Sequence, residues 1–167
     1  GTGKAGSTIK VYDGATLLGE TTVKPDGSWS FTPGTALSDG AHSITVTATD
    51  KAGNTSEPTK PFNFTVDTVP PTAPSIESAL DDVGAKQGAL ANGSVTDDPS
   101  PTLSGKAEAG STVTINDNGA LLGKVVADAE GNWSYTPTTP LAEGEHKFTV
   151  SATDKAGNTS APSAEFV

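Results

Sequence analysis

The sequence predicts an all-β protein, and three observations lead to that fold class. Gly (19) and Pro (12) are frequent among the 167 residues, only 33% of residues are hydrophobic, and Thr and Ser are abundant. This mixture favours strands and turns over helices. Apolar and polar residues alternate with a period of two in several short segments, and turn-forming residues separate those segments. A helical protein is therefore not expected.

The chain contains an internal repeat at an offset of 104 residues, which pairs residues 1–63 with 105–167 without a gap. About half of the paired residues are identical, and the segment 50–56 recurs unchanged as 154–160. Two copies of one fold are therefore predicted. The first copy has no counterpart of residues 67–104, so we expect an incomplete first domain in a piece of a longer array.

Alternation and turns locate the strands of the complete copy. His146, Phe148 and Val150 alternate with polar residues, for example, and Asp117-Asn118-Gly119 is a typical hairpin turn. The predicted strands are residues 74–80, 101–107, 111–117, 120–127, 132–136, 145–153 and 161–167. About seven short strands per hundred residues is typical of an immunoglobulin-like sandwich. We therefore expect tandem immunoglobulin-like β-sandwiches, the first truncated at its N-terminal strands.

The domain boundaries follow from the repeat and from a proline pair. Residues 1–66 form the incomplete repeat and residues 72–167 the complete one. Residues 67–71 between them include Pro70 and Pro71, which fix φ and lack amide donors. This segment is predicted to be a short, semi-rigid linker.

Charge and composition exclude several classes of function. Lys and Arg total 10, all of them Lys, against 20 Asp and Glu, which gives a net charge of -10. Proteins that bind nucleic acid neutralise phosphates with clustered Lys and Arg, so a nucleic-acid partner is not expected. No apolar run is long enough to insert into a membrane. The absence of Cys excludes disulfides, Cys-ligated metals and Cys nucleophiles.

Several motifs occur in order along the chain and together indicate a family. They are Asp-Thr-Val-Pro-Pro at 67–71, Pro-Thr-Leu-Ser-Gly at 101–105, Gly-Asn-Trp-Ser-Tyr at 131–135 and Ala-Thr-Asp-Lys-Ala-Gly-Asn at 152–158. With the repeat, they resemble the bacterial Ig-like repeats of giant surface adhesins, such as Bap-like biofilm proteins and adhesins exported by type I secretion. The resemblance covers essentially the whole chain.

The resemblance implies a role and a location. Most such repeats are stalk segments outside the bacterial cell, which project a terminal binding region, and calcium often stiffens the array. Implied partners are neighbouring Ig-like repeats of the same chain, together with a host-cell or abiotic surface contacted through other regions. The implied protein is an extracellular, cell-surface adhesin repeat involved in biofilm formation, and not an enzyme.

A long acidic connection is the strongest candidate for a calcium site. Residues 81–99 show little strand pattern, and loops of this length within a domain tend to be functional or disordered. Between residues 67 and 98 the chain has six carboxylates and one Lys (Lys86), a net charge of -5 that is half of the total. The six are Asp67, Glu77, Asp81, Asp82, Asp97 and Asp98. Ca²⁺ takes about six to eight oxygen ligands. The alternative is a solvated acidic loop whose Asp residues cap turns.

A second calcium hypothesis concerns the domain junction. Asp154 and Asn158 bound a turn in which a purely structural role for Asp is the main alternative. In an immunoglobulin topology that turn lies at the end where the chain enters, so Asp154 could approach Asp67 in the linker. The predicted metal ligands are Asp67, Asp81, Asp82, Asp97, Asp98 and Asp154, with Ca²⁺ as the cofactor.

The histidines and tryptophans are predicted to be structural. His42 and His146 are equivalent positions on the inward face of a strand, without a His-x-x-x-His pair or a nucleophile elbow around them. Trp29 and Trp133 each precede a second inward aromatic residue by two positions, which indicates core packing. No catalytic residues are predicted.

The sequence leaves two other classes of function open. One is a carbohydrate-binding or spacer module of a secreted polysaccharide-active enzyme, in which the two Trp rings would lie exposed on a flat face. The other is a homotypic interaction domain that joins cells through an exposed edge strand.

Overall fold

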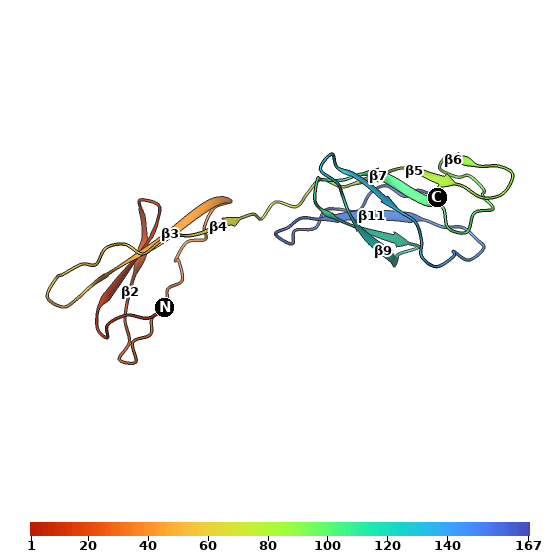
Figure 1. Ribbon diagram of the computed structural model, residues 1–167. Coiled ribbons are helices and arrows are strands. Elements are labelled where there is room, and N and C mark those ends of the chain that lie inside the picture. The colour runs from red at the N-terminus through yellow and green to blue at the C-terminus, as the bar shows by residue number, and fades with distance from the viewer. The chain divides into compact units, whose positions relative to one another are not determined.

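The computed structural model describes residues 1–167, which form two compact units, Gly1–Thr68 and Val69–Val167. All regular elements are β-strands and every strand pairing is antiparallel, so the predicted all-β class is confirmed (Figure 1). Since the regular elements are all strands, the chain has no helix that could span a membrane.

The first unit is built on one four-stranded sheet with the order β2-β1-β3-β4. Its strands are β1 (Thr8–Asp13), β2 (Thr16–Thr22), β3 (Gly40–Thr49) and β4 (Phe62–Val66). Buried Ile9, Val11 and Val23 form its core, against which partly buried residues such as Trp29 and Val46 pack. This unit therefore consists of a single sheet with one face covered by its core residues.

The second unit is a sandwich of two sheets, which Figure 1 shows as two layers. One sheet has the order β10-β7-β5-β6 and the other has the order β11-β8-β9. The strands are β5 (Ser75–Asp81), β6 (Gly88–Leu90), β7 (Thr102–Lys106), β8 (Thr112–Asp117), β9 (Ala120–Val126), β10 (Asn132–Tyr135) and β11 (Phe148–Thr153). Leu103 from one sheet and Val113, Ile115 and Val150 from the other are completely buried in the shared core.

Local sequence explains the central hairpin of each unit. Asn118 and Gly119 both have positive φ (49° and 80°), as the tightest hairpin turns require, and join β8 to β9. The register then shifts between Ile115 and Asn116, and the same shift occurs in the first unit between Val11 and Tyr12. Such a bulge increases strand twist. Its recurrence 104 residues apart indicates that both copies fold by the same local rules.

The strand predicted at 145–153 begins at Phe148, and the structure also differs from the predicted strands at two other places. The acidic connection, expected to lack strands, contains β6, which pairs with the end of β5. The segment 161–167 forms only an isolated bridge between Phe166 and Phe148 instead of a strand. In the first unit, by contrast, the equivalent position Phe62 begins β4, whose five residues pair with β3.

Candidate functional site

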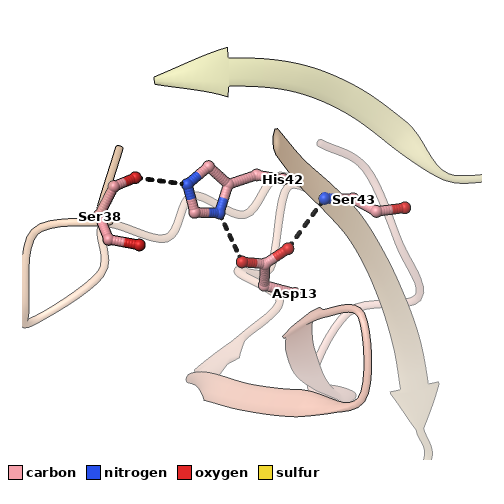
Figure 2. Close-up of polar contacts among 4 residues, drawn as sticks. All are labelled: Asp13, Ser38, His42 and Ser43. Carbon is pink, nitrogen blue, oxygen red and sulfur yellow. Dashed lines mark hydrogen bonds and ion pairs between the residues drawn. The ribbon is translucent and has the colours of Figure 1, made fainter. Parts of the chain in front are cut away.

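The most closely organised polar cluster of the first unit is centred on His42 (Figure 2). Nδ1 of His42 lies 2.6 Å from Oδ2 of Asp13, and Nε2 lies 2.7 Å from the backbone carbonyl oxygen of Ser38. Oδ1 of Asp13 accepts the backbone N–H of Ser43 at 2.8 Å. Both ring nitrogens therefore face acceptors, an arrangement that only the doubly protonated imidazolium satisfies with two donors.

The second unit repeats this cluster. His146 Nδ1 lies 2.7 Å from Asp117 Oδ2, and His146 Nε2 lies 2.8 Å from the Ala142 carbonyl oxygen. Oδ1 of Asp117 is buried and has no hydrogen-bond partner, whereas its counterpart in Asp13 accepts the Ser43 amide. The Asp117 carboxylate of the second unit therefore has one oxygen fewer in a hydrogen bond than the Asp13 carboxylate of the first unit.

The environment of each imidazole favours its charged form. The hydrogen bond to Asp13 is the main cause that raises the pKa of His42, and the Ser38 carbonyl adds to it. For His146 the Ala142 carbonyl is the main cause of a raised pKa. The hydrogen bond from His42 in turn lowers the pKa of Asp13. Neither imidazole has a free nitrogen to act as a general base. The pair is a structural brace that joins the hairpin turn to β3 in the first unit and to the segment just before β11 in the second, where His146 lies outside the strand that the sequence predicted for it.

We predict that this brace makes stability depend on pH. Because both His pKa values are raised above 6.5, their contribution is complete below about pH 6.5 and is lost as the pH rises through the folded-state values. Asp13, whose pKa is lowered, contributes above about pH 4 and loses this contribution as the pH falls. Urea unfolding midpoints should therefore fall between pH 6 and pH 9. A His42→Gln/His146→Gln double variant should lose this slope, and an unchanged slope would refute the assignment.

The turns expected at Asp50 and Asp154 use their carboxylates internally. Asp154 Oδ1 accepts the backbone N–H of Asn158 at 2.9 Å, and Oδ2 accepts the Asn158 side-chain amide at 2.9 Å. Asp50 binds Asn54 in the same way. Hydrogen bonds from these Asn side chains lower the pKa of both Asp residues. Asp154 therefore has the geometry of a turn-stabilising residue.

The acidic connection brings its two ends together. Asp81, 3% exposed at the end of β5, accepts the Thr96 hydroxyl at 2.6 Å through Oδ2 and the Val83 amide at 3.1 Å through Oδ1. The Thr96 hydroxyl oxygen also accepts the backbone N–H of Asp98 at 3.0 Å. One hydroxyl thus connects the carboxylate at the start of the loop to the backbone at its end.

Asp98 is a buried carboxylate of this loop with one unpartnered oxygen. It is 6% exposed, and its Oδ1 accepts the Ser100 amide at 2.8 Å. Its Oδ2 is buried with no hydrogen-bond partner, an arrangement that is costly for a carboxylate unless a donor or a cation compensates it. Among the predicted metal ligands, it alone has a buried oxygen without a partner.

The other predicted ligands lie in different surroundings. Asp82 and Asp97 are exposed, and a methyl group at Gly84 would lie 2.1 Å from Oδ2 of Asp97, so that carboxylate lies against the loop backbone. Asp67 is exposed at the end of the first unit, whereas Asp154 belongs to the second unit. The structure gathers no group of three or more His, Asp or Glu side chains in a position to hold a metal ion.

The tryptophans lie against the cores, as predicted. Trp133 is 3% exposed and donates its indole N–H to the Ser75 carbonyl oxygen at 3.2 Å. Trp29 is partly exposed and donates to the Thr2 carbonyl oxygen. A flat sugar-binding surface that uses both rings is therefore not formed.

The His–Asp brace is the arrangement that sequence reasoning missed. Asp13 and Asp117 were interpreted only as hairpin-turn residues, and both do begin such turns. A signal was available, because an Asp precedes a His by 29 residues in both copies. The two antiparallel sheets of the second unit define a β-sandwich of the immunoglobulin type.

The chain belongs to the bacterial Ig-like domain family, whose model matches residues 1–68 and 72–167. It is 34% identical over 167 residues to exoglucanase B of Cellulomonas fimi. That match covers 98% of this chain and 14% of the exoglucanase, so the chain spans about a seventh of that relative.

Two solved structures are also similar to the chain. The fibronectin(III)-like modules of Clostridium thermocellum CbhA match with a TM-score of 0.52 and 19% identity, over 97% of this chain and 77% of theirs. This likeness confirms the fold. A biofilm-associated protein BSP domain matches with a TM-score of 0.40 and 27% identity, over 97% of this chain and 24% of that chain.

Proposed function

We propose that the chain is a pair of structural stalk repeats of a bacterial cell-surface adhesin, which acts outside the cell in adhesion and biofilm formation. The tandem occurrence of two bacterial Ig-like domains, with Pro70 and Pro71 between them, carries this proposal. In both units the organised polar clusters brace the fold. The partners are neighbouring repeats of the same chain, and other regions contact the host-cell or abiotic surface. A chain without Cys could pass unfolded through a type I export channel.

The test is deletion of residues 1–167 from the full-length protein in its bacterium. Antibodies against this segment should label intact cells before the deletion. After it, the protein should still reach the surface, while attachment and biofilm mass fall because the binding region lies closer to the cell. Absence of surface labelling, or normal attachment by the deleted protein, would contradict the proposal.

A second candidate is a spacer module of a secreted polysaccharide-active enzyme, and the 34% identity to exoglucanase B favours it. The burial of Trp133 argues against a sugar-binding version of this role. If the chain is a spacer, the same deletion should reduce hydrolysis of insoluble polysaccharide by the full-length protein and leave hydrolysis of soluble substrate unchanged. If the full-length protein is an adhesin, it should hydrolyse neither the insoluble polysaccharide nor the soluble substrate.

Calcium is part of the proposed role, and the buried, unpartnered Oδ2 of Asp98 is the observation that supports it. Asp81 lies within the same hydrogen-bonded network through Thr96. Calcium accepts carboxylate, carbonyl and water oxygens, so Asp98 and backbone carbonyls of the acidic loop would hold it, with exposed Asp82 and Asp97 nearby in sequence. The hypothesis for Asp67 and Asp154 at the domain junction remains a separate prediction.

If calcium binds at Asp98, it should stabilise the second unit. A ligand that binds only the folded state at ten times its Kd adds about 1.4 kcal/mol, which is measurable as a rise in melting temperature. The rise should be absent with Mg²⁺ or chelator and in Asp98→Asn. Glu57→Gln, in the first unit, is the matched control and should keep it.

Equal melting with Ca²⁺ and with chelator would refute the proposal. An undiminished rise in Asp98→Asn would refute the assignment to Asp98, and the same titration of Asp67→Asn and Asp154→Asn would test the junction hypothesis.

A further inference from the structure

A pocket of about 280 Å³ lies in the first unit, between the turn that precedes β1 and the turn that follows β3. The two strands are paired so that Thr8 lies opposite Thr49, which brings the two turns together. Residues 4–7 and 50–52 line the pocket. Its volume is just below the usual range for small-molecule sites, so it suits a ligand of about one sugar ring.

Two lysines give this pocket a positive charge. A methyl group at Gly6 would lie 3.1 Å from Cε and 3.6 Å from Nζ of Lys51, so the charged end of Lys51 lies against the first turn. Hydrogen bonds from Asn54 are the main cause that lowers the pKa of Asp50, and the nearby Lys4 ammonium adds to it. The lining therefore has two positive charges and one negative charge, a net +1 that a ligand with one negative charge would neutralise.

Ser7 supplies a hydrogen-bond donor that has no partner in the chain. It lines the pocket and is 4% exposed, and its hydroxyl makes no hydrogen bond within the structure. Its counterpart Ser111 is 1% exposed and donates its hydroxyl to the Glu108 carbonyl oxygen at 2.7 Å. Buried hydroxyls are normally hydrogen-bonded, so the unused Ser7 hydroxyl is available to a ligand in the pocket.

The second unit shows that this set of charges is not needed to build the turn. A backbone hydrogen bond from Ser7 to Lys4 closes the turn in the first unit, and one from Ser111 to Glu108 closes it in the second. Because Glu108 replaces Lys4 and the other two charged residues are of the same type in both units, the corresponding residues of the second unit carry -1. The positive lining and the unused hydroxyl therefore belong to the first unit alone.

Asp50 adds an acceptor, which narrows the class of ligand. Its Oδ1 accepts the backbone amides of Ala52 and Asn54, whereas Oδ2 accepts only the Asn54 side-chain amide, at 3.1 Å. A carboxylate oxygen has two lone pairs, so Oδ2 can also accept a hydroxyl group of a ligand. A dianion such as phosphate would exceed the net positive charge of the lining. The pocket therefore matches a ligand that combines one carboxylate with neighbouring hydroxyls.

We propose that this pocket binds a sugar acid, a ligand with one carboxylate and several hydroxyls. Lys4, Lys51 and the Ser7 hydroxyl hold the carboxylate of the ligand. A ring hydroxyl of the ligand donates to Oδ2 of Asp50. A free uronic acid and a uronic acid unit of a polysaccharide present this same chemistry. The site goes beyond the proposed stalk role and does not depend on it.

The test is an NMR titration of the ¹⁵N-labelled chain 1–167 with D-galacturonate. Amide signals of residues 4–7 and 50–52 should shift and saturate in the millimolar range, because a small ligand makes few contacts. Signals of the corresponding residues 108–111 and 154–156 should not shift, and neutral D-galactose should shift none. Tri-galacturonate is titrated in parallel. Much tighter binding of the trimer would assign the site to a polysaccharide, and equal binding would assign it to the free sugar acid.

Three variants test the assignment to individual residues. Lys4→Glu gives the first unit the residue of the second and should weaken binding by about tenfold or more. Lys60→Glu makes the same change of charge outside the pocket and should leave binding unchanged. Ser7→Ala should weaken binding without lowering the melting temperature, because the hydroxyl has no partner in the chain.

Three outcomes would overturn the proposal. They are no shift at tens of millimolar D-galacturonate, equal shifts with D-galactose, and undiminished binding by Lys4→Glu. Equal or tighter binding of inorganic phosphate at residues 4–7 would overturn the assignment to a sugar acid, since the pocket would then take anions without regard to hydroxyl groups.

Discussion

Replacement of Gly105 by alanine should destabilise the second unit by about 3 kcal/mol, the upper end of the usual cost of overpacking a core. A Cβ at this position would lie 1.9 Å from the backbone carbonyl oxygen of Ser75 and 3.0 Å from the Trp133 ring. The Ser75 oxygen accepts the Trp133 indole N–H, and β5 is fixed between β6 and β7. The backbone cannot move away without breaking these contacts.

Calorimetry of the whole chain would measure the effect, and a loss of this size in a unit of about a hundred residues corresponds to a fall in melting temperature of roughly 15 °C. Gly34→Ala is the matched control, because a Cβ there meets nothing within 4 Å. It should change stability by less than about 0.5 kcal/mol. If Gly105→Ala melted like the control, the close approach of β5 and β7 at this point would be wrong.

Local patterns were sufficient to predict most of the strands. The hairpin of β8 and β9 was predicted to within about a residue at each end, because alternation and an Asn-Gly turn are both local signals. The strand expected at 145–153 begins only at Phe148, because the segment 161–167 forms a bridge only at Phe148, whereas β4 pairs with residues 40–44 in the first unit. β6 has three residues, too few to show a period.

The site was harder to predict because its contacts join distant segments. His42 was expected to pack inward, and it is 7% exposed, but its partner Asp13 lies 29 residues away on another strand. Periodicity describes which face a residue occupies and not what it meets there. The same limit applies to Asp98, whose unpartnered oxygen depends on burial that loop composition does not reveal.

The two copies also allow one core position to be tested in two environments. Val150→Ala should cost about 2–3 kcal/mol, because it removes two methyl groups from a side chain that is 0% exposed and leaves a cavity between the sheets. Val46→Ala removes the same atoms from the equivalent position, which is only partly buried, and should cost about 1 kcal/mol. NMR-detected urea titrations, following amides of each unit separately, would measure both losses.

The difference between these two losses measures how much a second sheet contributes to the burial of this core position. Val150 belongs to the same core cluster as Ala79 on β5 and Leu103 on β7, whereas the described strands of the first unit form one sheet. The larger loss is therefore expected for Val150→Ala. Equal losses for the two variants would mean that the Val46 side chain is enclosed as completely as that of Val150 in solution.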